Sequence, residues 1–155
     1  MDMNKVLKSE KIQSLRLRTA VSLERSTPLK KVLDAMRVNK TGAVVIVDNK
    51  KIVGIFTERD AMTRVVEQKI DGNTPIEKLM TPDPKVLRME DSVADVIQLM
   101  NKGGYRHIPL VDSQGEIQGM VTVRDIIKYL AEHFPYEIYN LPPDPNQIMQ
   151  APEGA

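Results

Sequence analysis

The chain has 155 residues and no cysteine, which excludes disulfide bonds and thiolate metal sites. Its formal net charge of +1, with 28% charged and 41% hydrophobic residues, is typical of a globular protein and gives no reason to expect a nucleic-acid partner. No apolar run reaches the roughly 20 residues that a membrane span requires, and the N-terminus lacks the apolar segment of a signal peptide. We therefore expect a soluble, cytoplasmic protein that binds neither nucleic acid nor membrane.

Residues 1–75 are predicted to form a short lead-in helix and a first structural unit. The unit begins with an amphipathic helix, whose apolar residues follow the spacing i, i+3, i+4 and i+7: Leu29, Val32, Leu33 and Met36. Residues 43–47 and 52–56 are apolar and flank a turn, so they are expected to pair as a β-hairpin. A second helix is predicted over residues 57–66, with these side chains facing inward: Ala61, Met62, Val65 and Val66.

Residues 76–133 contain a proline-rich linker at 81–84 and then repeat this order of elements. The apolar residues of the repeated helix lie at one constant offset from their counterparts: Val93, Val96, Ile97 and Met100. A second hairpin is predicted from residues 108–111 and 117–121, and a closing helix over residues 122–130. The recurrence indicates a tandem duplication. Because one small repeat buries little surface alone, we expect the two copies to pack about a pseudo-two-fold axis with two clefts between them.

Residues 134–155 form a proline-rich C-terminal tail. Its first part, residues 134–142, contains five large apolar or aromatic residues and is too apolar for a free tail: Phe134, Tyr136, Ile138, Tyr139 and Leu141. We expect this segment to lie against the globule or against a second subunit.

One phrase occurs twice, once in each repeat. Residues 54–60 and 119–125 both consist of glycine, two apolar residues, threonine, a variable residue, arginine and aspartate. Each phrase is predicted to be the end of a strand that runs into a helix, where free backbone N–H groups and the helix dipole suit a phosphate or a hydroxyl-rich ligand. The threonine and the aspartate also have the form of a capping box, which stabilises a helix without binding any ligand.

Two repeats of helix, strand, turn, strand and helix, with this phrase at the last junction, resemble a cystathionine-β-synthase (CBS) domain pair, or Bateman module. The resemblance covers roughly residues 10–133 and includes Arg-His-Ile-Pro-Leu-Val-Asp at 106–112 and Met-Thr-Pro at 80–82. It implies an α/β fold of tandem CBS repeats and regulatory binding of adenosine-containing ligands in the clefts, with Asp60 and Asp125 holding the ribose. It also implies that the modules pair into flat homodimers.

The candidate ligand-binding residues are the two Thr–Asp pairs, nearby cations for a phosphate, and strand residues that could flank an adenine: Thr57, Arg59, Asp60, Val44, Val45, Arg106, His107, Ile108, Pro109, Thr122, Arg124 and Asp125. The strand residues fit an ordinary core equally well, and a single arginine at a helix start is more often a surface ion-pair partner. Because Arg106, His107 and Arg124 are expected near the second junction, tight binding is predicted to depend on Asp125 more than on Asp60.

The sequence offers little for catalysis. Its two histidines are too few for a zinc site without several converging carboxylates, and no nucleophile elbow or phosphate-binding loop is present. We therefore expect a non-enzymatic, homodimeric module without a cofactor, which binds AMP, ADP or ATP and signals occupancy by a conformational change to an unidentified protein target. The alternative is a CBS-pair interaction or dimerisation protein with vestigial, unoccupied clefts.

Overall fold

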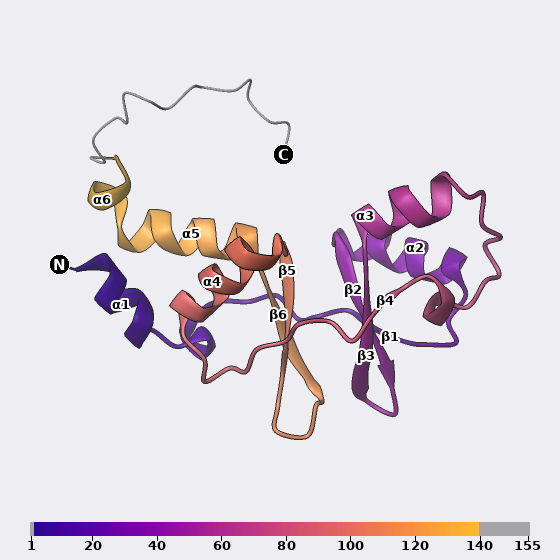
Figure 1. Ribbon diagram of the computed structural model, residues 1–155, viewed down its shortest axis with the longest axis horizontal. Coiled ribbons are helices and arrows are strands. Elements are labelled where there is room, and N and C mark those ends of the chain that lie inside the picture. Colours follow the sequence, from indigo (N-terminus) through magenta and orange to yellow (C-terminus); the bar gives the residue numbers. More distant parts are fainter. Residues whose placement is uncertain (1, 140–155) are drawn as a thin grey trace.

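The computed structural model describes residues 2–139, which form two α/β units whose strands face each other (Figure 1). The first unit has a four-stranded sheet with its strands in this order: β1 (Ser22–Glu24), β2 (Ala43–Asp48), β3 (Lys51–Thr57) and β4 (Thr81–Pro82). β1 runs parallel to β2, and the other neighbours are antiparallel. The helical segments of this unit are α2 (Leu29–Asn39), α3 (Glu58–Asp60), which continues as the π-helix η2 (Ala61–Val66), and the 3-10 turn η3 (Ile76–Lys78).

The second unit is built on the antiparallel pair β5 (His107–Val111) and β6 (Ile117–Thr122). Its helices are α4 (Val93–Gly103), α5 (Val123–His133) and the short α6 (Pro135–Tyr139). The N-terminal helix α1 (Met3–Ser9) and the 3-10 turn η1 (Ile12–Ser14) also lie on this unit, beside α4 (Figure 1). The α/β fold and the repeated order of elements predicted from the sequence are confirmed.

Both hairpins form where the sequence predicts them, and each turn has a local cause. In the first hairpin, Asn49 and Lys50 make a two-residue turn with positive φ angles of 50° and 68°, which matches the twist of the strands. In the second, the Asp112 side chain accepts hydrogen bonds from the backbone N–H groups of Gln114 (2.8 Å) and Glu116 (3.0 Å). These turns fix the register of each pair and therefore the point at which each strand ends.

The segment that precedes each unit in the sequence packs on the other unit. Ile12 lies ahead of the first unit, but it belongs to the core of the second, and its backbone N–H donates to the carbonyl of Asp91 (2.9 Å). Ile76 lies ahead of the second unit, but it belongs to the core of the first, and its backbone N–H donates to the carbonyl of Thr27 (2.8 Å). The two repeats thus exchange their lead-in segments, and α1, which the sequence places with residues 1–75, lies against the second unit.

A third apolar cluster lies between the two units. It combines the inner faces of β2 and β3 with one residue of β6: Ala43, Val45, Val47, Ile55 and Met120. A backbone hydrogen bond from Ile52 to the carbonyl of Gly115 (3.2 Å) crosses the same boundary. The units therefore pack on each other through their strands.

Three apolar side chains that belong to the predicted helical patterns are exposed. Leu33 is 38% exposed, and Met62 and Val66 are each 62% exposed. The reason is that a helix of the first unit contacts its sheet through one narrow side. In η2, Ala61 and Val65 pack against the core, which leaves Met62 and Val66 facing away from it. The inward assignment of Met62 and Val66 is wrong.

The start of the C-terminal tail packs on the second unit only in part. Phe134 is 1% exposed and belongs to the core of that unit, whereas Tyr136 is 76% exposed. Residues 140–142, which were expected to lie against the globule or a second subunit, are outside the described residues.

The two glycines of the repeated phrase are not equivalent. A Cβ added to Gly54 would lie 2.2 Å from the Met80 sulfur, whereas one added to Gly119 would have its nearest neighbour, a Leu110 methyl, at 3.8 Å. Gly54→Ala is therefore expected to lower the free energy of unfolding by about 1–3 kcal/mol through overpacking. Gly119→Ala is the matched control and should change it by less than about 1 kcal/mol. Urea denaturation measures both, and equal losses would contradict the role of Met80.

Candidate ligand site between the two units

A cavity of about 540 Å³ lies at the junction of β3 and α3 and is shared by the two units. The first unit contributes the end of β3 and the start of α3, and the second contributes the segment before β5. The linker between the units closes one side. The lining residues are Gly42, Ile55, Thr57, Glu58, Arg59, Asp60, Thr81, Pro82, Asp83, Pro84, Lys85, Gly104, Tyr105, Arg106 and His107. A volume of this size is typical of a site for a small organic molecule.

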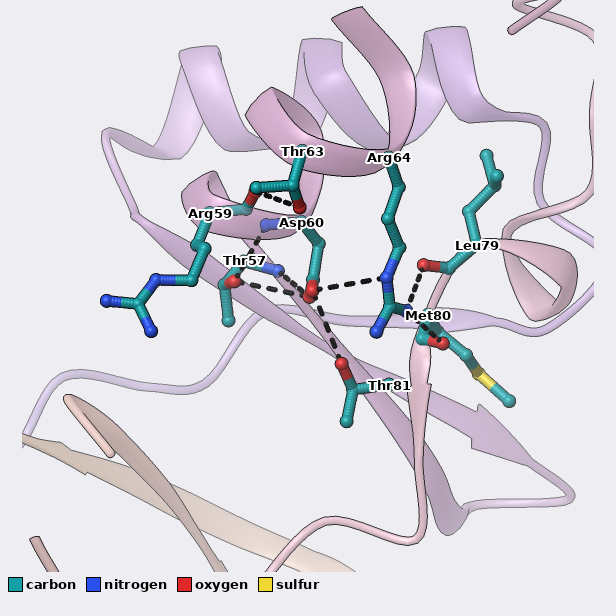
Figure 2. A network of polar contacts seen from close by, with 8 residues as sticks. All are labelled: Thr57, Arg59, Asp60, Thr63, Arg64, Leu79, Met80 and Thr81. Atoms are coloured by element: carbon teal, nitrogen blue, oxygen red, sulfur yellow. Dashed lines mark hydrogen bonds and ion pairs between the residues drawn. The ribbon is translucent and has the colours of Figure 1, made fainter. Parts of the chain in front are cut away.

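Thr57 and Asp60 form a complete capping box at the edge of this cavity (Figure 2). The Thr57 hydroxyl accepts a hydrogen bond from the Asp60 backbone N–H (3.2 Å), and Asp60 Oδ2 accepts one from the Thr57 backbone N–H (3.0 Å). Thr122 and Asp125 form the same box at the start of α5, with distances of 3.2 Å and 2.8 Å. The capping interpretation is therefore correct at both junctions. In each box the cap uses Oδ2, so the question of ligand binding concerns Oδ1.

Asp60 Oδ1 has partners that the sequence did not reveal. The Thr81 hydroxyl donates to it (3.3 Å), and Arg64 Nε lies 3.8 Å from it (Figure 2). Arg64 also donates from Nη1 to the carbonyls of Leu79 (2.9 Å) and Met80 (2.8 Å). An arginine four residues after an aspartate is a recognisable helical ion-pair spacing, but its reach to the linker cannot be read from that spacing.

Four side chains that can carry positive charge line the cavity: Arg59, Lys85, Arg106 and His107. Arg106 and His107 were expected near the second junction, and His107 does pair with Thr122 there. The backbone of Arg106 does lie there, because its carbonyl accepts from the Val123 N–H (3.0 Å), but both residues line the cavity at Asp60. The start of β5 thus contacts the second junction through the backbone of Arg106, and Arg106 and His107 line the cavity at the first junction. The phosphate-binding argument therefore applies to the cavity at Asp60 as well as to the second junction.

The remaining candidates lie outside the lining of this cavity. Val44, Val45 and Ile108 are fully buried in apolar clusters, and Pro109 is also buried, because the strands that carry them are covered on both faces. Thr122, Arg124 and Asp125 lie at the second junction. Roles in adenine or ribose binding remain predictions for these seven residues.

The His107 imidazole has a lowered pKa. Burial disfavours its charged form and is the main cause, while Glu58 and Asp125 oppose the shift and Arg106 adds to it. Since the unfolded chain takes up this proton at a higher pH than the folded protein, stability should fall as the pH drops below about 6.5.

The stability loss from His107 protonation is testable. The slope should not exceed about 1.4 kcal/mol per pH unit for this one group, and it should disappear from His107→Gln. Denaturant unfolding of wild type and variant at pH 7.5 and pH 5.5 measures it. Identical pH dependence in the two proteins would contradict the assignment.

Residues 2–139 contain no group of three or more metal-ligating side chains arranged to hold an ion. No helix in that range is long and apolar enough to cross a membrane.

The two α/β repeats share a cavity and define a tandem-repeat architecture, and comparison with known proteins gives the family. The CBS domain model matches residues 13–67 and 76–132, so the chain belongs to the CBS domain family, with one repeat in each match. An uncharacterized 17.7 kDa protein of Acidianus ambivalens is 35% identical over 98 residues, which cover 63% of this chain and 58% of that protein. The CBS domain-containing protein CBSCBSPB3 of Arabidopsis thaliana is 33% identical over 102 residues, which cover 65% of this chain and 18% of that protein. The chain thus spans less than two thirds of both relatives.

Solved structures of CBS domain proteins are similar to this chain, in agreement with its family. A CBS domain protein from Pyrobaculum aerophilum, complexed with AMP, has a TM-score of 0.70 at 26% identity and covers 79% of this chain and 98% of its own. The CBS domain pair of protein MJ0100, in complex with 5′-methylthioadenosine and S-adenosyl-L-methionine, has a TM-score of 0.70 at 21% identity and covers 77% and 98%. At that identity the second likeness shows the fold alone. The resemblance noted in the sequence is confirmed.

Proposed function

We propose that this protein is a regulatory CBS pair, a Bateman module, that binds an adenosine-containing ligand of the AMP, ADP or ATP class in the cavity at Asp60. The observation that carries the proposal is the composition of the cavity, where an aspartate at a helix start lies near cations contributed by both units. The related Pyrobaculum aerophilum protein, complexed with AMP, supports the ligand class. The protein acts without catalysis or a cofactor, in the cytoplasm, with no nucleic-acid or membrane partner.

The chemistry of the cavity suits the parts of an adenine nucleotide. The Asp60 carboxylate can accept hydrogen bonds from ribose hydroxyls, and Arg59 and Arg106 can pair with a phosphate. His107 is disposed to take up a proton beside a phosphate, since an adjacent anion favours its charged form. Because the ligand contacts residues of both units, its binding biases their relative position, and an unidentified protein target detects this change.

A second candidate function is that of an interaction protein with empty clefts. The observation that favours it is that both Thr–Asp pairs already form complete capping boxes, so neither pair needs a ligand to explain it.

Native mass spectrometry of freshly purified protein, followed by calorimetric titration with AMP, ADP and ATP, separates the two functions. A copurified adenine nucleotide or a micromolar dissociation constant is the result expected of a sensor. No copurified nucleotide together with no titration signal would support the interaction protein.

We also propose that the protein is a homodimer. Met62, Val66 and Ile127 are more than 60% exposed on η2 and α5, and apolar side chains in that position are suited to an interface. Light scattering at low micromolar concentration should give twice the 17.5 kDa of one chain. The double variant Met62→Lys, Ile127→Lys should give a single-chain mass, because charges at an apolar contact oppose association. A wild-type mass near 17.5 kDa would contradict the dimer.

A further inference from the structure

Both oxygens of the Asp60 carboxylate have partners within the protein. Oδ2 accepts from the Thr57 backbone (3.0 Å) and hydroxyl (3.2 Å). Oδ1 accepts from the Thr81 hydroxyl (3.3 Å) and pairs with Arg64 Nε (3.8 Å). A carboxylate has about four lone-pair sites, and three hydrogen bonds and one ion pair reach this one (Figure 2). A ribose hydroxyl that approaches Oδ1 therefore competes with the Thr81 hydroxyl and with Arg64.

The two partners of Oδ1 also fix the linker between the units. Thr81 is part of the linker, and Arg64 donates to the carbonyls of the two residues before it, Leu79 and Met80 (Figure 2). The chain continues from Thr81 along the cavity wall, residues 81–85, and into the second unit. One carboxylate oxygen thus connects the cavity with the segment that joins the repeats. We call Asp60, Arg64 and Thr81 the Asp60 latch.

The latch is absent from the second repeat, although the capping box is present there. Asp125 Oδ2 accepts from the Thr122 backbone (2.8 Å) and hydroxyl (2.9 Å), but among the described residues no hydrogen bond or ion pair reaches Asp125 Oδ1. The residue four positions after Asp125 is Tyr129, which is 5% exposed and packs in the core. The residue that corresponds to Thr81 is Leu17, whose side chain has no hydrogen-bond donor.

The helix that follows the strand-to-helix junction also differs between the two repeats. Arg64 lies in a π-helix, η2, whereas α5 is a regular α-helix from Val123 to His133. π-helical turns are rare and occur often at functional sites. The latch is therefore a feature of the first repeat alone and is not needed to cap a helix.

We propose that Thr81 and Arg64 lower the ligand affinity of the cavity by competing with ribose for Asp60 Oδ1. This inference rests on the proposed function. An adenosine ligand binds by displacing the Thr81 hydroxyl from Oδ1, and the displacement loosens residues 79–81. Occupancy of the cavity is thereby passed to the linker, and the affinity is lower than that of the same cavity without the latch.

The first test is the affinity for AMP of Thr81→Val, which removes the competing donor and keeps the shape of the side chain. Isothermal titration calorimetry should show binding about three- to tenfold tighter than in the wild type, the effect of removing one competing hydrogen bond. Thr63→Val is the matched control, because the Thr63 hydroxyl donates to the Arg59 carbonyl (2.9 Å) and not to Asp60, and its affinity should not change. Equal or weaker AMP binding by Thr81→Val would overturn the competition.

The second test needs no ligand and follows amide hydrogen exchange in residues 79–83. Arg64→Met removes the donors to the linker but keeps an apolar stem, and exchange there should be at least about fivefold faster than in the wild type. Exchange in residues 79–83 should also become faster when the wild type is saturated with AMP. Thr63→Val should leave this exchange rate unchanged. An unchanged exchange rate in Arg64→Met would contradict the claim that Arg64 holds the linker in place. If neither wild type nor Thr81→Val bound AMP, both the proposed function and the competition for Oδ1 would be contradicted. The exchange rates of Arg64→Met would still test, independently of any ligand, whether Arg64 holds the linker.

Discussion

Asp60→Ala is expected to lower the affinity for AMP by about 10- to 150-fold in a calorimetric titration. The reason is the loss of a charge-assisted interaction with the ribose, which contributes about 1.5–3 kcal/mol. The same substitution removes the acid of a capping box and its contacts with Thr81 and Arg64, so the free energy of unfolding should also fall, by at least about 1 kcal/mol. Thermal melts beside the titration separate these two effects.

Asp125→Ala is the matched control for this prediction. Asp125 has the same place in an equivalent capping box, but it does not line the cavity. The variant should lose about 1 kcal/mol of stability, the contribution of the cap, and keep AMP binding in the cavity within about twofold. The reverse pattern, with affinity lost in Asp125→Ala alone, would place the site at the second junction. Unchanged affinity in both variants would mean that the two carboxylates serve only as caps.

Ile12→Ala is expected to lower the free energy of unfolding by about 2–5 kcal/mol, because Ile12 is 0% exposed in a packed core. The lead-in segments are exchanged, so the damage should appear in the second unit although Ile12 precedes the first. Urea denaturation measures the total loss. Hydrogen exchange should show that α4 and β5 lose protection before β2 does.

Gln13→Ala is the control for the exchange of lead-in segments. The Gln13 side chain is exposed, and the residue uses only its backbone N–H, which donates to the carbonyl of Met89 (3.0 Å). Its substitution should change the free energy of unfolding by less than about 0.5 kcal/mol. Loss of protection confined to the first unit in Ile12→Ala would contradict the exchanged arrangement.

The elements of the fold were predictable because local rules determine them. Apolar runs that flank a turn gave both hairpins, and Gly104, with a φ of 67°, ends α4 where the sequence breaks the helical pattern. The phrase shared by the repeats gave both strand-to-helix junctions and the position of Asp60. Each of these features depends on residues that are close together in the sequence.

Features that depend on distant residues were not predictable in the same way. The lead-in segments have the same apolar pattern whichever unit they contact, so their exchange does not appear in the sequence. The side of β5 that Arg106 and His107 face follows from how the two units pack. The contact from Arg64 to Leu79 and Met80 joins a helix to a linker beyond it, and no spacing rule predicts such a contact. The exposure of Met62 likewise depends on which side of a short helix meets the sheet.

A crystal structure of the protein grown with saturating AMP tests the central claim most directly, because it shows where the ligand lies. We predict AMP in the cavity between the units, with its ribose hydroxyls within hydrogen-bonding distance of Asp60 Oδ1 and the Thr81 hydroxyl turned away. The phosphate should lie near Arg59, Arg106 or His107. An empty cavity at saturating AMP, with the contact between Thr81 and Asp60 intact, would contradict both the site and the latch.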